Sequence, residues 1–419
     1  MDNIKKTIPT GNKKCINAVY ISSYLPRKCG IATFTDDLVS AIDKLCATNP
    51  AEIIAMTDPG QTYEYPKKVK FQINQYRKDD YIAAAEYINK SKIDVVSLQH
   101  EFGLYTGPES SYTCCLSAGA KQEENYNGNI ENGYYLLSML DIITKPIITT
   151  FHTILSEPND QQMYIARRII EQSAVVIAMT EVSRQSLIDL YDCPAEKVVV
   201  ISHGVPDFDY NHVEKWQKKL GINNASPMIL TAGLLGPGKE LEYVIDAMPS
   251  ILKKAPNAKL FIVGQTHPVI IKNDGEVYRE KLTNLVKLND VVDSVEFVNH
   301  YLTDADLRDY FQAADFFVTA YSNMQQSASG TLAWALGSGK ICISTPYQYA
   351  RELLSDGAGV LVEQKNTSAI AKSITDIYND PVRADQIREK AYDKGHRHIW
   401  ANVATEYVNL FNNVLKKGK

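Results

Sequence analysis

Short apolar segments alternate with amphipathic helical segments along the whole chain. In one helical segment, Leu241, Val244, Ile245, Met248 and Leu252 recur at the spacing that places them on one face. The apolar segments are rich in β-branched residues, which is typical of strands that are buried on both faces. This alternation predicts parallel β-sheets with helices on both sides, and therefore the doubly wound α/β class.

The expected strands fall into two groups. The first group is 18–22, 52–56, 69–73, 94–98, 147–151, 175–178 and 198–201, and the second is 228–232, 259–263, 294–298, 316–319, 341–344 and 360–362. A chain of 419 residues exceeds the size at which one hydrophobic core keeps growing. We therefore expect two Rossmann-like domains, residues 1–204 and 205–396, joined at His203-Gly204-Val205-Pro206.

Two segments lie outside this pattern. Residues 400–415 carry an apolar stripe, and we expect a helix at 397–417 that packs back on the first domain. The same stripe would also suit peripheral contact with a membrane surface. Residues 117–133 are polar and rich in Gly and Asn, which predicts a long loop. That loop is either a lid or acceptor-binding element, or an insertion without a function.

Composition and charge narrow the range of partners. A net charge of -5 argues against nucleic acid, and seven cysteines without metal-ligand spacing predict reduced thiols. No apolar segment reaches the length that crosses a bilayer, and the first residues lack the apolar core of a signal peptide. The sequence therefore predicts a cytoplasmic protein that binds a small molecule.

The glycine-rich loop 231–239 lies between an expected strand and an expected helix. Its residues Gly233, Gly236 and Gly238 let backbone N–H groups approach an anion, and Lys239 adds positive charge. The loop is either a phosphate-binding cradle or an ordinary turn with a surface lysine. The neighbouring strand ends decide between these alternatives, because ligands of open α/β sheets bind beyond the carboxyl ends of the strands.

A basic loop follows the first expected strand. Arg27, Lys28 and Gly30 precede a helix that has Ile31 on its apolar face, so basic side chains and helix N-terminal amides face one crevice. This loop could hold the phosphate or carboxylate of a second substrate. The alternative is a long turn that is capped by a threonine at position 33 or 35.

Histidines stand at two neighbouring strand ends. His100, beside Glu101, follows the fourth expected strand, and His152 follows the fifth. Each histidine either contacts a ligand or is a satisfied core residue, and Glu101 either acts as an acid or base or orients the imidazole. No third partner stands at metal-ligand spacing, so we expect no metal site.

Small and amide side chains follow the strand expected at 316–319. Gln326, Ser329, Gly330 and Thr331 come before a helix expected at 333–337. This segment either offers free N–H groups to an oxyanion or to sugar hydroxyls, or it is an ordinary capped loop.

In this order and at these spacings, the motifs resemble those of the retaining nucleotide-sugar glycosyltransferases of family 4, over nearly the whole chain. The residues that carry the resemblance are 26–30, His152, 203–205, 232–239, 261–264, 326–339 and 352–359. The resemblance implies the GT-B architecture, in which two Rossmann-like domains face a deep cleft.

The resemblance and the strand-end positions together give three groups of candidate residues. The candidate catalytic residues are His152, near the hydroxymethyl group of the sugar, Lys239, on the donor diphosphate, and Gln326. The candidate donor-binding residues are Gly233, Gly236, Gly238, Lys239, Gly264, Ser329, Gly330, Thr331, Trp334 and Glu352. The candidate acceptor-binding residues are Arg27, Gly30, Ile31, His100 and Glu101.

The chain departs from the family pattern at three positions. Leu234 stands where the family usually has an arginine, and Gln326 and Trp334 stand where it usually has two glutamates. The Gln326 amide can still hydrogen-bond to sugar hydroxyls, but it carries no charge. Trp334 cannot accept a bidentate hydrogen bond from a ribose. Recognition of the nucleoside would therefore differ from the family norm.

The resemblance implies a retaining enzyme that moves a hexose from a nucleotide diphosphate sugar to a hydroxyl of a saccharide or lipid-linked saccharide. GDP-mannose is the expected donor and UDP-glucose the second choice, with no cofactor and no metal. The three departures leave open a catalytically silent sugar-nucleotide-binding protein, and the architecture leaves open a sugar phosphorylase or an epimerase. A dehydrogenase is disfavoured because no Gly-x-Gly-x-x-Gly motif follows the first strand of either domain.

Overall fold

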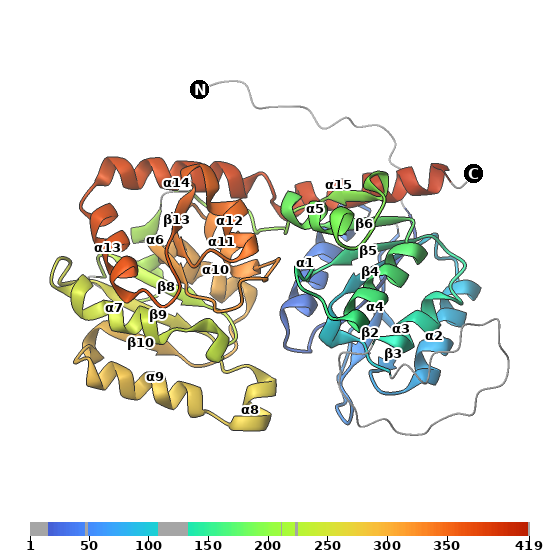
Figure 1. Ribbon diagram of the computed structural model, residues 1–419, viewed down its shortest axis with the longest axis horizontal. Helices are drawn as coiled ribbons and strands as arrows, with labels where there is room; N and C mark the ends of the chain where they lie inside the picture. The colour runs from blue at the N-terminus through green and yellow to red at the C-terminus, as the bar shows by residue number, and fades with distance from the viewer. Residues whose placement is uncertain (1–15, 47–48, 108–132, 211, 223–224, 418–419) are drawn as a thin grey trace.

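The computed structural model describes residues 16–46, 49–107, 133–210, 212–222 and 225–417. These residues form two lobes that lie side by side, each built around one β-sheet (Figure 1). Every strand pair in both sheets is parallel. The predicted class, two doubly wound α/β units, is therefore confirmed.

The first sheet has seven strands in the order β3-β2-β1-β4-β5-β6-β7. The strands are β1 (Ala18–Ser22), β2 (Glu52–Thr57), β3 (Val69–Asn74), β4 (Val95–His100), β5 (Ile147–Phe151), β6 (Val175–Ala178) and β7 (Val198–Val200). The helices of this lobe are α1 (Gly30–Leu45), α2 (Lys78–Lys90), α3 (Tyr134–Leu140), α4 (Asp160–Gln172) and α5 (Glu181–Asp189). The strand order reverses between β1 and β4, which is where open sheets of this class bind ligands.

The second sheet has six strands in the order β10-β9-β8-β11-β12-β13. The strands are β8 (Met228–Ala232), β9 (Lys259–Val263), β10 (Val295–Val298), β11 (Phe316–Thr319), β12 (Ile341–Ser344) and β13 (Gly359–Leu361). The helices are α6 (Val213–Lys219), α7 (Glu242–Leu252), α8 (Pro268–Asp274), α9 (Val277–Leu288), α10 (Asp304–Ala313), α11 (Gly330–Gly337), α12 (Gln348–Leu354), α13 (Thr367–Tyr378) and α14 (Pro381–His396). Here the order reverses between β8 and β11.

Most strands coincide with the apolar segments of the sequence. All residues of β1, β5 and β8 are buried, because helices cover both faces of each sheet. The strand boundaries agree with the prediction to within one residue, except at the end of β4. β4 continues two residues beyond its expected end, as far as His100, which pairs with Phe151 of β5, so His100 belongs to the strand instead of following it.

The chain passes between the two lobes twice, and the two crossings pair with each other. Val205 donates its N–H to the carbonyl of His398 at 2.9 Å and accepts the N–H of Trp400 at 2.9 Å. Gly204 leaves room for this pairing, because a Cβ at that position would lie 2.1 Å from the ring of Trp400. The junction of the lobes is thus two adjacent chain segments.

The last helix, α15 (Trp400–Lys417), lies on the first lobe (Figure 1). It packs against α1, and Val403, Tyr407 and Phe411 are buried in the core that α1 and β1 share with it. The apolar stripe at residues 400–415 is therefore used for packing inside the molecule.

Within the described residues, no helix combines the length and the apolarity that are needed to cross a bilayer. Of the loop predicted at 117–133, residues 117–132 lie outside the described part of the chain.

Candidate active site

A cavity of about 590 Å³ lies between the two lobes. The first lobe lines it with residues of α1 and of the loop after β4, and the second lobe lines it with the loops after β8, β9 and β11. The predicted residues that line this cavity are Gly30, Glu101, Gly233, Lys239, Gly264, Gln326, Ser329, Gly330, Thr331 and Trp334. The carboxyl ends of strands from both sheets therefore meet at one site.

The glycine-rich loop places the Lys239 ammonium in the cavity. Gly233 has a φ of 118°, and a Cβ at this position would lie 3.2 Å from Lys239 Nζ, so the glycine leaves space for the ammonium. The loop does not lead directly into α7. A 3₁₀ turn at Pro237–Lys239 and the left-handed residue Glu240 intervene before the helix begins.

Gly264 brings the loops after β8 and β9 together. A Cβ on Gly264 would lie 2.2 Å from the carbonyl oxygen of Gly233, and the φ of Gly264 is 131°. No other residue fits this position, which explains why the two loops form one continuous wall of the cavity.

The N-terminus of α11 adjoins the glycine-rich loop, because a Cβ on Gly233 would lie 3.6 Å from Thr331 Cγ2. The hydroxyl of Ser329 caps the helix, which begins at Gly330, three residues earlier than the predicted start, and the N–H of Leu332 donates to it. Gly330 and Thr331 line the cavity in the first turn, where backbone N–H groups have no partner inside the helix. The Gln326 amide donates to the carbonyl of Ala328 at 3.0 Å and so stabilises the loop before the helix.

Trp334 forms an aromatic wall at the position where a glutamate is usual in the resembled family. It lines the cavity and packs against Phe208 and Phe311, each at 5.8 Å between ring centroids. This part of the cavity therefore offers an apolar surface instead of a carboxylate.

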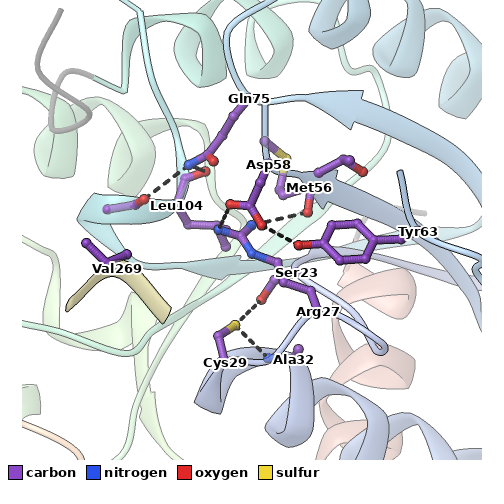
Figure 2. Close-up of polar contacts among 12 residues, drawn as sticks. Ser23, Arg27, Cys29, Ala32, Met56, Asp58, Tyr63, Gln75, Leu104 and Val269 are labelled. Atoms are coloured by element: carbon purple, nitrogen blue, oxygen red, sulfur yellow. Dashed lines mark hydrogen bonds and ion pairs between the residues drawn. The ribbon is translucent and has the colours of Figure 1, made fainter. Parts of the chain in front are cut away.

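On the first lobe, α1 starts at the edge of the cavity. The cap of α1 is Cys29, whose thiol accepts the N–H of Ala32 at 3.4 Å and lies 3.0 Å from the hydroxyl of Ser23 (Figure 2). The alternative cap, Thr33 or Thr35, is wrong because the helix begins at Gly30 and both threonines lie within it. Gly30 thus presents the first turn of α1 to the cavity.

Arg27 does not line the cavity. Figure 2 shows its guanidinium against Asp58, at 2.7 Å, and against the carbonyl of Met56, at 3.2 Å. The Tyr63 hydroxyl donates to the same carboxylate at 2.7 Å. The structure thus places Arg27 in a contact between the loops that follow β1 and β2, where its charge is paired with that of Asp58. Ile31, the residue after Gly30, packs against the core of the first lobe.

The two strand-end histidines are buried behind the cavity. His152 Nε2 lies 3.0 Å from Gln99 Oε1, and burial lowers the pKa of His152 to about 3. His100 packs in parallel with the ring of Tyr105 at 6.0 Å, and burial lowers the pKa of His100 to about 3 as well. Both imidazoles are therefore neutral at pH 7, and neither reaches the cavity lining.

Glu101 does reach the cavity. Its carboxylate accepts the hydroxyl of Thr153 at 2.6 Å and the N–H of Phe102 at 3.1 Å. Burial raises the pKa of Glu101, and these two hydrogen bonds offset the rise only in part.

Three predicted donor-binding residues lie away from the main cavity. Gly236 and Gly238 line an adjoining cavity of about 280 Å³. Glu352 lies in the contact between the lobes, where its carboxylate accepts the N–H groups of Glu181 and Val182, each at 2.9 Å. These two amides begin α5, so Glu352 of the second lobe joins a helix N-terminus of the first.

Several cavity residues were missed from the sequence. Asp37 of α1 and Asp304 of α10 face the cavity from opposite lobes, and Tyr321 lies beside Lys239. Burial, together with the charge of Asp304, raises the pKa of Asp37 to about 8. The sequence did not mark Asp37 as a cavity residue, because an acidic residue on an amphipathic helix normally faces solvent. His203, which was assigned only to the junction, also lines the cavity.

Within the residues that the structure describes, no group of three or more His, Cys, Asp or Glu side chains could hold a metal ion.

Two protein-family models match the chain. The model described as Glycosyl transferases group 1 matches residues 212–394, and the one described as Glycosyltransferase Family 4 matches residues 130–207. The first match contains the Lys239 loop and α11, and the second contains His152 and the end of the first lobe.

Individual relatives are distant. An uncharacterized glycosyltransferase of Methanocaldococcus jannaschii is 26% identical over 57% of this chain and 60% of its own length. The alpha-monoglucosyldiacylglycerol synthase of Streptococcus pneumoniae is 23% identical over 95% of this chain and 87% of its own length.

Solved structures agree on the fold. The Anabaena protein HepE, in complex with UDP and glucose, is 15% identical and superimposes with a TM-score of 0.69 over 95% of this chain and 100% of HepE. Both matching family models describe glycosyltransferases, and the solved structures share the GT-B fold, so the chain is similar to GT-B glycosyltransferases of the family 4 type.

Proposed function

We propose that this protein is a glycosyltransferase that moves a hexose from a nucleotide diphosphate sugar to a hydroxyl of a saccharide or lipid-linked saccharide, with retention of the anomeric configuration. One observation carries the proposal. The Lys239 ammonium and the first turn of α11, at Gly330 and Thr331, line the same cavity between the lobes. An ammonium and free helix amides together are suited to a diphosphate.

The reaction needs little from the protein beyond position and charge. The bond between the sugar C1 and the diphosphate oxygen breaks, the acceptor oxygen bonds to C1 on the same face, and the acceptor proton passes to the departing phosphate oxygen. The products are a glycoside and a nucleoside diphosphate. Lys239 and the α11 amides would stabilise the negative charge that develops on the leaving diphosphate.

This mechanism tolerates the exchange of the family's glutamates for Gln326 and Trp334. No step uses a carboxylate nucleophile. Gln326 would hydrogen-bond to the sugar, and Trp334 would offer its ring to the sugar or the base. With Leu234 in place of arginine, the positive charge from the loop after β8 comes from Lys239.

The resemblance to mannosyl-transferring members of the family favours GDP-mannose as the donor, with UDP-glucose as the second choice. The names of the similar proteins point the other way, since one makes a glucosyl lipid and one was solved with UDP and glucose. We therefore place the two donors side by side in one test.

The test measures nucleoside diphosphate release from UDP-glucose and from GDP-mannose, with a panel of alkyl glycosides and of lipid-linked saccharides as acceptors. Acceptor-dependent release by the wild type, lost in Lys239→Ala and retained in Lys287→Ala, is the expected result. Lys287 is an exposed lysine of α9 and serves as the matched control.

Two outcomes would contradict the proposal. Stabilisation by a nucleoside diphosphate in a melting experiment, without release from any donor, would instead indicate a silent binding protein. Phosphate-dependent formation of a sugar phosphate, without any nucleotide, would indicate a phosphorylase.

A further inference from the structure

Tyr321 lies where the two donor-binding loops of the second lobe meet. It follows β11 by two residues, its side chain is only 4% exposed, and it lines the cavity. The next residue, Ser322, donates its N–H to the carbonyl of Gly238 at 3.1 Å. The backbone around Tyr321 is thus tied to the loop that carries Lys239.

The phenol of Tyr321 holds the ammonium of Lys239. Lys239 Nζ donates to the Tyr321 hydroxyl at 2.6 Å and lies 4.3 Å from the centre of the ring. The ammonium also lies close to Gly233, where a Cβ would approach Lys239 Nζ to 3.2 Å. The lysine therefore has one defined position at the cavity wall, between a glycine and a tyrosine.

The same phenol also faces α11. Its hydroxyl lies 3.4 Å from Thr331 Oγ1, which lies 3.4 Å from Ser329 Oγ, the cap of the helix. Burial by itself would raise the pKa of Tyr321, but the charge of Lys239 and the hydrogen bonds from Lys239 and these hydroxyls lower it below its ordinary value. A phenol that is held in this way is a stronger hydrogen-bond donor than a free one.

This contact matters because lysine is flexible. A lysine loses side-chain entropy when it is fixed in one position. A partner that fixes the ammonium before the donor binds removes that cost from the binding step. Lys239 has three N–H donors, so two remain for phosphate oxygens after one is given to Tyr321. Leu234 supplies no second cation in this loop. Stabilisation of the diphosphate by the loop therefore depends on the position of the Lys239 ammonium alone.

We infer that Tyr321 is a positioning residue for the donor diphosphate: its phenol fixes the Lys239 ammonium and connects it to the N-terminus of α11. This inference rests on the proposed function of the same cavity. Tyr321 acts through Lys239 and does not itself take part in bond making or breaking.

The test compares Tyr321→Phe with Tyr347→Phe. Both changes remove one buried hydroxyl and no carbon atom, and the two rings stack at 5.1 Å between centroids. Tyr347 does not line the cavity. We expect kcat/KM for the donor to fall about 10- to 100-fold in Tyr321→Phe, as for a lost hydrogen bond to a charged group, and to stay within about threefold in Tyr347→Phe.

Separate values of kcat and KM show whether Tyr321 positions the Lys239 ammonium during the reaction or only holds it in the free enzyme. Charge on the diphosphate grows in the transition state, so a misplaced ammonium should lower kcat more than it raises KM. If Tyr321 only holds Lys239 while the donor is absent, Tyr321→Phe should leave kcat unchanged and lower KM. That outcome would overturn the inference.

A double-mutant cycle tests whether Tyr321 acts through Lys239. In a Lys239→Met background, Tyr321→Phe should cause no further fall in kcat/KM, because the ammonium that it positions is gone. Additive losses would mean that the tyrosine acts independently, through packing. Melting temperatures of all four proteins are measured alongside, since a purely structural effect would lower them in both backgrounds.

The failure of this inference and the failure of the proposed function look different. A wild-type protein that releases no nucleoside diphosphate from any donor contradicts the proposed function. A wild-type protein that transfers sugar while Tyr321→Phe behaves like Tyr347→Phe contradicts only the role of Tyr321.

Discussion

The two sides of the cavity differ in how they use the polar residues that stand at strand ends. On the second lobe, Lys239, Gly330 and Thr331 face the cavity with groups that are available to a ligand. On the first lobe, Arg27 and His152 are engaged in contacts inside the lobe. The second lobe thus offers an ammonium and the first turn of a helix to the cavity, whereas the first lobe offers the first turn of α1 and the carboxyl groups of Asp37 and Glu101.

The largest expected effect comes from the second-lobe side of this comparison. Lys239→Ala should lower turnover at least about a hundredfold, on the scale of one lost donor in an oxyanion-type site. Steady-state kinetics with the accepted donor measure it, and Lys287→Ala is the control. Near-normal turnover in Lys239→Ala would show that the second lobe does not supply the charge on which turnover depends.

Substitution of Arg27 on the first lobe should change the stability of the protein and leave substrate binding unchanged. Arg27→Ala leaves the partly exposed carboxylate of Asp58 without its cation and should lower the free energy of unfolding by about 1 kcal/mol. Denaturant unfolding measures this loss, and the acceptor KM measured below the transition should not change. An acceptor KM that rises tenfold while stability is retained would show that Arg27 binds the acceptor, as the sequence predicts.

A smaller effect is expected from the contact between the lobes. Glu352→Gln weakens the bond to the N-terminus of α5 by about 1 kcal/mol and should raise the donor KM about fivefold, because the arrangement of the lobes that forms the cavity becomes less populated. Small-angle scattering should show a larger radius of gyration for the variant. Glu389→Gln on the exposed face of α14 is the control, and equal behaviour of the two variants would argue that Glu352 does not hold the two lobes together.

The smallest expected effect is a change in pH dependence. The folded protein holds the Asp37 proton up to about pH 8, whereas the unfolded chain releases it at the ordinary pKa of an aspartate. Rising pH between these values therefore favours unfolding, and stability from this group is greatest below the unfolded pKa. Asparagine cannot ionise, so Asp37→Asn should raise Tm more at pH 8 than at pH 5, by about 2 °C or more.

The control for this prediction is Asp393→Asn on the exposed face of α14, which should shift Tm equally at both pH values. An equal shift in Asp37→Asn would show that the Asp37 carboxyl ionises normally in the cavity.

The fold was predictable because strands that are buried on both faces appear in the sequence as short segments rich in apolar and β-branched residues. Strands such as β1, β5 and β8 are buried at every residue and consist mostly of apolar and β-branched residues, and each falls at its expected range. The exception at β4 has a simple cause. Its last residue, His100, is polar in type, and only the pairing with Phe151 shows that the strand includes it.

The site was predictable where backbone conformation is decisive. Gly233 and Gly264 are required by a positive φ and a close approach of backbone, so their positions mark the cavity wall. The side chains of Arg27, His152 and Glu352 were not predictable in this way. Whether each one faces a ligand or a protein partner depends on residues far away in the chain, such as Asp58 for Arg27 and α5 for Glu352.

The sequence by itself determined two doubly wound sheets, the loops at their strand ends and the absence of an arginine beside Gly233, because these depend on local periodicity and residue type. The tertiary structure alone decided which polar side chains are free. It placed Asp37 and Tyr321 in the cavity and removed Arg27 and His152 from it. The physical reason is that a charged or polar group is satisfied by whichever partner the fold brings within hydrogen-bond distance, and sequence neighbours do not reveal that partner.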